Sequence, residues 1–297
     1  MQIAIIGTTA SGKSDLGIKL AKKVGGIILS LDSLSIYKEI DIASAKPTKE
    51  EMGDILHFGI DEIYPNEAFN VTIFFDLYKK SFEISQKKNV PLIIVGGTSF
   101  YLKAMLSGLS DKPLISEENR AKTLRALRDL KASHELIKNI DFEASLKIEE
   151  NDSYRIEKWL EIYYETEEVP SVFLKRTLRE PIIKNLPIFE IETDREVLRK
   201  RIEIRTKKMI EAGLVDEVAR LEKKYTREPN CMKAIGLKEV IDYFDGIYSL
   251  EEMGNKIATN TAKLAKRQRT FNKTQFLEYS LVKKPLEDLE EEILKVL

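Results

Sequence analysis

The chain has 297 residues, and its 43% hydrophobic content is typical of a soluble globular protein and excludes a disordered one. Forty-eight Lys and Arg nearly cancel forty-nine Asp and Glu, so any attraction to nucleic acid must come from local basic faces. A single cysteine and two histidines exclude a disulfide framework and a zinc cluster. With no transmembrane run, no signal peptide and no sign of tight association, we expect a cytoplasmic monomer without a membrane partner.

A short apolar strand, residues 3–6, runs directly into a glycine-containing loop. Residues Gly7–Ser14 follow the pattern G-x-x-x-x-G-K-S, and the residues after them have helical spacing. In this arrangement backbone N–H groups surround a phosphate, the helix adds its positive N-terminal end, Lys13 reaches the phosphates and the Ser14 hydroxyl can hold Mg²⁺. We therefore predict a protein that handles a phosphorylated small molecule; an incidental glycine turn is the alternative.

Two further apolar runs, residues 27–31 and 92–95, lack alternation and are typical of parallel strands buried on both faces. The first is followed by Asp32 and Ser33, and the second by Gly96-Gly97-Thr98, which places both loops with Gly7 at the ligand-binding edge of a parallel sheet. The spacing predicts a crossover helix over 72–88. Residues 186–191 are a fourth strand candidate, with Pro187 at its start or near a sheet edge.

From about Ser116 to Arg179 the strand-like runs vanish and charged helical stretches follow one another, at 117–130, 142–148 and 153–165. This change predicts a helical insertion and three segments: residues 1–115, the insertion 116–180, and residues 181–297, which complete the core. In the last segment we expect one long charged helix over 194–224, another over 250–271 and a closing helix in the acidic tail, 285–297.

The strand over 92–95 does not end in the Mg²⁺-ordering aspartate that ATP hydrolases and switch proteins carry there, which weakens an ATPase interpretation. Asp32 is the strand-end carboxylate; it is a candidate base or metal ligand, or alternatively the N-cap of a following helix. Thr98 could contact phosphate or cap the helix 99–106. Basic helix faces, which are usually solvated, occur at Arg201, Arg205 and Lys208 and again over 263–269.

Taken in order, the motifs of this chain resemble those of the tRNA dimethylallyltransferases, or tRNA isopentenyltransferases, over nearly its whole length. The matching pieces are the phosphate loop, Asp32-Ser33 with Tyr37, residues 42–47 (Ile-Ala-Ser-Ala-Lys-Pro), residues 95–98 with Tyr101, Asn151-Asp152 with Arg155, residues 234–236 with Lys238-Glu239, and residues 264–268 (Leu-Ala-Lys-Arg-Gln).

This resemblance implies an α/β fold, in which a phosphate-loop, kinase-like parallel sheet has helices on both faces and an all-helical insertion grips tRNA. The implied reaction transfers the dimethylallyl group of dimethylallyl diphosphate to N6 of adenosine 37 in the tRNA anticodon loop, with Mg²⁺ as cofactor. Asp32 would be the general base, and Lys13, Thr98 and Arg205 would stabilise the leaving diphosphate. The implied diphosphate-binding residues are Gly7, Thr8, Thr9, Ala10, Ser11, Gly12, Lys13 and Ser14, with Ser14 also the metal ligand.

The positions that match tRNA contacts in the family are Asp32, Ser33, Leu34, Ser35, Thr98, Arg120, Tyr154, Arg155, Lys158, Lys233 and Lys238. The chain departs from the common family pattern at several positions. Ser35 stands where many members have glutamine, Ala43-Ser44 where Gly-Thr is frequent, Lys158 and Ala262 where arginines are found, and Phe271 where a tryptophan is found. Ser44 keeps the hydroxyl and Lys158 the charge, whereas Ser35 replaces a side chain that would contact the base, and Ala262 removes a cation and is assigned no role. Two other functions share the phosphate loop: an ATP-dependent small-molecule phosphotransferase, and an RNA-associated nucleotide switch, for which no base-recognition motif is found.

Overall fold

The computed structural model describes all residues, 1–297, and the chain forms two compact units. The first, here called the core unit, comprises residues 1–103 and 183–297, and the second, the helical unit, comprises residues 104–182. The structure thus begins the inserted unit before residue 116, where the sequence predicts its start, and ends it close to the predicted residue 180.

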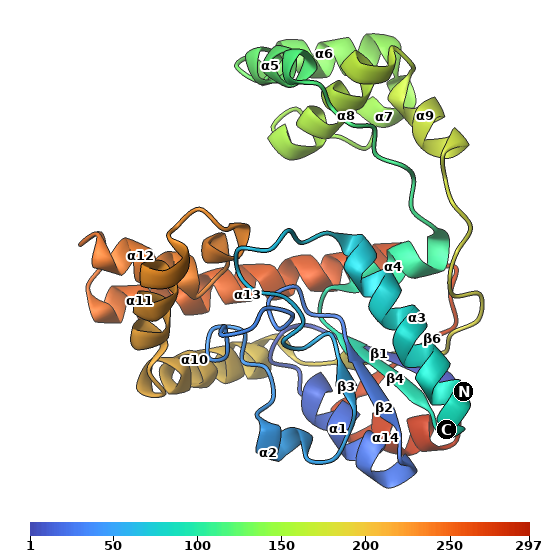
Figure 1. Ribbon diagram of the computed structural model, residues 1–297, viewed down its shortest axis with the longest axis vertical. Helices are drawn as coiled ribbons and strands as arrows, with labels where there is room; N and C mark the ends of the chain where they lie inside the picture. Colours follow the sequence, from blue (N-terminus) through green and yellow to red (C-terminus); the bar gives the residue numbers. More distant parts are fainter. The chain divides into compact units, whose positions relative to one another are not determined.

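A single sheet of six parallel strands forms the centre of the core unit, in the order β3-β2-β4-β1-β5-β6 (Figure 1). The strands are β1 (Gln2–Ile6), β2 (Ile27–Ser30), β3 (His57–Phe58), β4 (Leu92–Gly96), β5 (Ile188–Glu192) and β6 (Leu281–Pro285). The predicted strands are present, and Pro187 immediately precedes β5, where its carbonyl accepts the N–H of Ala4 at 2.9 Å. Because all strands are parallel, β1, β2 and β4 deliver their following loops to one edge of the sheet.

Helices cover both faces of this sheet, as predicted for an α/β protein. On one face, α1 and α14 pack over Ile3, Ile5 and Phe189, and on the other α3 packs against β2 and β4. The helical elements that lie wholly or partly in the core unit are α1 (Lys13–Val24), α2 (Lys49–Met52), α3 (Val71–Lys88), α4 (Ser99–Ser107), α10 (Arg195–Glu211), α11 (Leu214–Tyr225), a 3₁₀ turn (Asn230–Lys233), α12 (Leu237–Phe244), α13 (Leu250–Gln275) and α14 (Leu286–Leu294).

The expected single helix over 194–224 is wrong. The chain leaves the helical conformation after α10 and re-enters it at α11, because Gly213 adopts a left-handed φ of 96° and becomes the N-cap of the second helix. This break lets α11 run in a new direction beside residues 41–43. Strand β6, which precedes the predicted closing helix, was not predicted from the sequence.

The helical unit contains no strand, and beyond the end of α4 its helices are α5 (Glu117–Ala126), α6 (Leu130–Ile140), α7 (Phe142–Ser145), α8 (Ser153–Thr166) and α9 (Pro170–Arg176). Its core forms around Trp159, Ile137 and Leu160. Asp141 is buried beside this core and accepts hydrogen bonds from Trp159 Nε1 at 3.0 Å and from the Ser171 N–H at 2.9 Å. The unit therefore has a hydrophobic core of its own. No helix of the chain is both long and apolar enough to span a bilayer.

Candidate active site

The loop Gly7–Ser14, here called the phosphate loop, joins the end of β1 to the start of α1. Gly12 is the N-cap of α1, has a φ of 92° and contributes no side-chain cap, so the first N–H groups of the helix are left for another acceptor. The positive end of the helix dipole points in the same direction. Lys13 bends back over the loop, and its Nζ donates to the carbonyl of Thr8 at 3.1 Å. The local geometry therefore suits an anion, as the motif predicts.

Three charged candidate residues from distant parts of the chain lie close enough to influence one another: Lys13, Asp32 and Arg205. Burial lowers the pKa of Lys13 to about 8; the Asp32 carboxylate opposes this shift and the Arg205 guanidinium adds to it. Burial also lowers the pKa of Arg205, and the carboxylates of Asp32 and Asp15 oppose that shift. The site thus combines two cations with one carboxylate beside the anion-binding loop.

Asp32 lies two residues beyond the end of β2, and its Oδ1 accepts the N–H groups of Leu34 at 2.9 Å and Ser35 at 3.1 Å. These bonds cap a turn, since the next helix, α2, begins only at Lys49, so the predicted alternative of a helix N-cap is wrong. They fix the carboxylate through one oxygen only. The side chain of Ser33 is exposed, whereas that of Ser35 is buried, so of these two serines only Ser33 is accessible from solvent.

Gln268, on α13, ties the phosphate loop to the turn after β4. Its Oε1 accepts the N–H of Thr9 at 2.8 Å, and its Nε2 donates to the carbonyl of Gly97 at 3.0 Å. A Cβ on Gly97 would lie only 2.7 Å from that Nε2, so a side chain at this position would displace the Gln268 amide. The N–H of the next residue, Thr98, donates a hydrogen bond to the Leu31 carbonyl at 3.3 Å. The sequence places Gln268 within a family motif but gives no sign of these partners.

We expect Gln268→Leu to weaken the binding of inorganic diphosphate about tenfold. The leucine cannot replace either hydrogen bond, each worth about 0.5–1.5 kcal/mol, and the phosphate loop becomes less well ordered. Calorimetric titration with diphosphate measures the effect. Gln275→Leu is the matched control, because this glutamine lies on the same helix, is exposed and touches neither loop. Equal affinities of the two variants would contradict the structural role of Gln268.

The donor groups at the phosphate loop suit Mg²⁺ that is bound together with a phosphate. The Ser14 side chain is exposed at the start of α1, and nowhere in the chain do three or more His, Cys, Asp or Glu side chains gather as for a metal. An all-protein cage is therefore not available. Mg²⁺ usually keeps several waters and takes most of its other ligands from substrate phosphates, and a single Ser14 hydroxyl fits that manner of binding.

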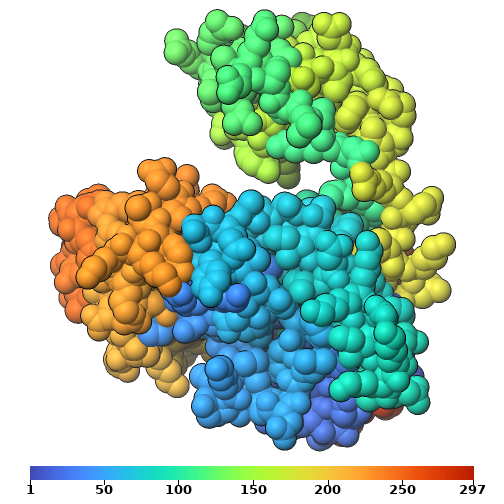
Figure 2. Space-filling model, viewed as in Figure 1, coloured from blue at the N-terminus to red at the C-terminus, as the bar shows by residue number.

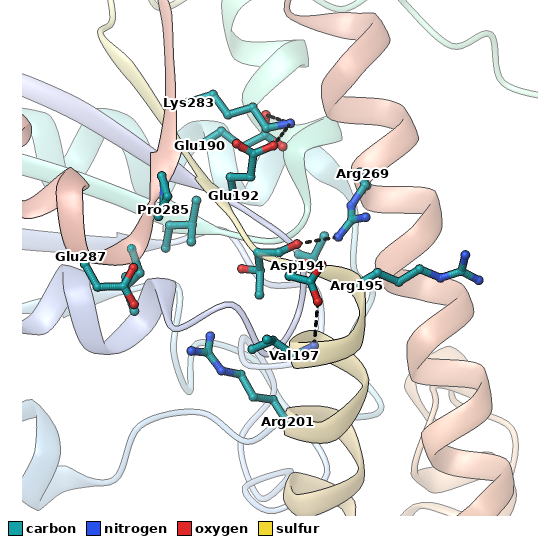
Figure 3. A pocket seen from close by; sticks show the side chains of 14 residues that line it. Glu190, Glu192, Asp194, Arg195, Val197, Arg201, Arg269, Lys283, Pro285 and Glu287 are labelled. Carbon is teal, nitrogen blue, oxygen red and sulfur yellow. Dashed lines mark hydrogen bonds and ion pairs between the residues drawn. The ribbon is translucent and has the colours of Figure 1, made fainter.

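A cavity of about 610 Å³ borders the phosphate loop at Thr8 but is not lined by Lys13, Asp32 or Thr98. In Figure 3 Lys283 pairs with Glu190 and Glu192, whereas Arg195, Arg201 and Glu287 lie apart from any oppositely charged side chain. Lys283 lies 3.6 Å from Glu192 and 3.9 Å from Glu190, and Arg269 donates to the Thr193 carbonyl at 2.9 Å. The cavity therefore does not contain the candidate catalytic residues.

The residues that match tRNA contacts fall in both units. Lys233 and Lys238 are exposed on the core unit, around the start of α12, and Arg120, Tyr154, Arg155 and Lys158 lie on α5 and α8 of the helical unit. Arg155 is exposed; its guanidinium donates to the carbonyl of Lys147 at 3.3 Å and forms an ion pair with Asp152 at 3.5 Å. Lys158 instead pairs with Glu157 at 2.7 Å and Glu161 at 2.9 Å; although burial opposes it, these bonds raise its pKa. Its charge is thus already partly neutralised.

Comparison with known proteins gives the same family as the motifs. The family model described as IPP transferase matches residues 35–275. A tRNA dimethylallyltransferase of Sulfurovum sp. (strain NBC37-1) is 54% identical over 99% of this chain and 97% of its own. The crystal structure of a tRNA isopentenylpyrophosphate transferase from Bacillus halodurans has a TM-score of 0.70 and 29% identity, covering 99% of this chain and 94% of that one. A eukaryotic dimethylallyltransferase, crystallised in snapshots of its action on tRNA, has a TM-score of 0.77 and 25% identity, covering 98% of this chain and 75% of its own. With its phosphate loop, its strand-end aspartate and this similarity over nearly its full length, the chain belongs to the IPP transferase family.

Proposed function

We propose that this protein transfers the dimethylallyl group of dimethylallyl diphosphate to N6 of adenosine 37 in the anticodon loop of tRNA and releases diphosphate. The observation that carries the proposal is the grouping of Lys13, Asp32 and Arg205 beside the phosphate loop, in a chain of the IPP transferase family. Two cations and the loop suit a diphosphate, and one carboxylate suits the proton of an attacking amine. Because the proposed substrate is tRNA, we expect the protein to act in the cytoplasm. Because the proposed site uses residues of one chain only, we expect a monomer to be active.

Charge develops on the diphosphate as its bond to the allylic carbon breaks. Lys13, Arg205 and the N–H groups at the start of α1 would stabilise that charge, and Thr98 would add its hydroxyl. Mg²⁺, when bound through Ser14 and the phosphate oxygens, supplies further positive charge to the leaving group. A diphosphate leaves without attack by water, so a strand-end carboxylate after β4 is not needed.

The exocyclic amine of adenine attacks the allylic carbon and must lose one proton. Asp32 is held through Oδ1 by two backbone N–H groups, and its other oxygen can accept that proton. The new N–C bond forms as the C–O bond breaks, so the proton passes to Asp32 and the electron pair of the C–O bond to diphosphate. The adenine has to leave the stacked loop to reach this carboxylate.

The competing function is an ATP-dependent phosphotransferase that uses the same loop. The deciding experiment incubates the full chain with unmodified tRNA, Mg²⁺ and either dimethylallyl diphosphate or ATP, and then digests the tRNA for mass spectrometry. The proposal predicts N6-dimethylallyladenosine with the first donor and an unchanged tRNA with the second. Turnover of ATP with no prenylated nucleoside would instead support the phosphotransferase.

We further expect the exposed arginines of the helical unit to bind the tRNA backbone. The double variant Arg120→Ala/Arg155→Ala should bind an anticodon stem-loop several-fold more weakly, and its plot of log K against log salt should be less steep by about one unit for each phosphate that it no longer neutralises. Its affinity for dimethylallyl diphosphate should not change, because both positions lie outside the core unit. Filter binding over a series of salt concentrations measures both the affinity and the slope.

Arg176→Ala is the control for this variant. Arg176 is also an exposed arginine of the helical unit, but it is paired with Glu168 at 2.7 Å and matches no tRNA-contacting position. The control should retain both the affinity and the salt slope of the unmodified protein. If the double variant does the same, the helical unit does not bind tRNA through these arginines.

A further inference from the structure

Glu217, in the first turn of α11, is a buried carboxylate that pairs with no cation. Its side chain accepts three backbone N–H groups: those of Asp41 and Ile42 on Oε2, at 2.9 Å and 2.8 Å, and that of Ala43 on Oε1, at 2.9 Å. The residue is only 2% exposed. Burying a carboxylate without a cation is costly unless hydrogen bonds replace its hydration, and three charge-assisted bonds do so here.

The segment that Glu217 holds, residues 41–45, is a turn without regular secondary structure. Within it the Ser44 hydroxyl donates to the Ile40 carbonyl at 2.6 Å, and Ala45 has a positive φ of 46°. No sheet partner takes up its N–H groups, so the Glu217 carboxylate supplies the acceptors that a neighbouring strand would otherwise provide. In Figure 2 the blue surface of the N-terminal region meets the orange surface of α11 and α12.

This turn is hydrogen-bonded to one candidate active-site residue, Arg205, through the carbonyl oxygen of Ser44. That oxygen accepts a hydrogen bond from Arg205 Nη2 at 3.4 Å. Arg205 is the cation whose electrostatic effect reaches both Lys13 and Asp32. The direction of its guanidinium therefore depends on where the turn is held, and the turn is held by Glu217.

We propose that Glu217 is a positioning residue, which acts through the turn 41–45 and the Ser44 carbonyl to orient the Arg205 guanidinium toward the diphosphate. The expected effect on dimethylallyl transfer rests on the proposed function. Glu217 itself touches neither substrate. Glutamine at this position keeps the size of the side chain but has one acceptor oxygen, and it turns an NH₂ group toward backbone N–H groups.

The test is a double-mutant cycle of Glu217→Gln and Arg205→Ala, read in single-turnover transfer and in titration with inorganic diphosphate. We expect Glu217→Gln alone to reduce the transfer rate and the diphosphate affinity about tenfold each. In the Arg205→Ala background the same change should alter each value less than twofold, because the group that it positions is gone. If Glu217→Gln does not fold, Glu217→Asp replaces it, since the shorter side chain keeps the charge but cannot reach all three N–H groups.

Glu190→Gln is the matched control, because Glu190 is likewise buried in the core unit and its Oε1 accepts from Asn272 at 3.1 Å. We expect Glu190→Gln to lower Tm as Glu217→Gln does. Its effect on the transfer rate and on diphosphate affinity should be small, and the same with Arg205 present and in the Arg205→Ala background. Equal losses for Glu217→Gln with and without Arg205, or a loss of Tm alone, would overturn the proposal. If the unmodified protein transfers no dimethylallyl group but the diphosphate titrations still show the coupling, the proposed function fails and the positioning role stands.

Discussion

Replacement of Asp32 by asparagine should leave the protein folded and able to bind dimethylallyl diphosphate but slow the transfer step by about 10²- to 10⁴-fold, the usual contribution of a general base. Asparagine is nearly the same size, and its Oδ1 can still accept the N–H groups of Leu34 and Ser35, so the turn after β2 is preserved. The amide cannot take the proton that the adenine amine must lose. Single-turnover transfer to tRNA under saturating donor isolates this step.

Asp54→Asn is the control for this prediction, because Asp54 is an exposed aspartate elsewhere in the core unit. It should transfer at the rate of the unmodified protein. Transfer by Asp32→Asn at that same rate would show that another group, or water, takes the proton.

Replacement of Lys13 by alanine should reduce the transfer rate by about 10²- to 10³-fold, the effect of removing one preorganised donor from a developing anion. Lys13 lies at the first residue of α1 and contacts the phosphate loop through the Thr8 carbonyl, so its ammonium is the cation built into the loop itself. Steady-state kinetics should show a lower kcat and weaker donor binding together. Lys22→Ala, an exposed lysine on the same helix, should change neither.

The lowered pKa of Lys13 predicts that kcat/KM depends on pH. The pKa of Lys13 is lowered to about 8, so in the free protein its ammonium is present below that pH and is lost as the pH rises through it. The value of kcat/KM for dimethylallyl diphosphate should therefore fall above about pH 8. This descending limb should be absent in Lys13→Ala. A limb that persists unchanged in the variant would assign the titration to another group.

Much of the core unit could be predicted because its signals are local. The buried runs that became β1, β2 and β4, and the loop that follows each, can be identified within a few residues of sequence. Strand β6 could not, because it is an edge strand that carries Lys283, Lys284 and Pro285 and pairs only with β5. The break between α10 and α11 depends on one residue, Gly213, in a stretch whose charge pattern is otherwise continuous.

The candidate site was predictable in its residues but not in its connections. The motifs name Lys13, Asp32 and Arg205, yet no spacing shows that a residue near position 205 lies beside residues 13 and 32. The same holds for the bonds of Gln268 to Thr9 and of Glu217 to residues 41–43, which join positions more than 170 apart in the sequence. Such contacts depend on how the helices after β5 pack against the sheet, and a single sequence contains no periodicity that reports this packing.

The most direct test of the account is a single-turnover reaction of the full chain with unmodified tRNA, Mg²⁺ and dimethylallyl diphosphate carrying an isotopic label in the allyl group. Nuclease mapping with mass spectrometry locates the label, and a coupled assay counts the diphosphate released. We predict one labelled group per tRNA, on N6 of adenosine 37, with an equal amount of diphosphate, and no release when tRNA is left out. Release of diphosphate without tRNA, or label on any other nucleotide, would contradict the account.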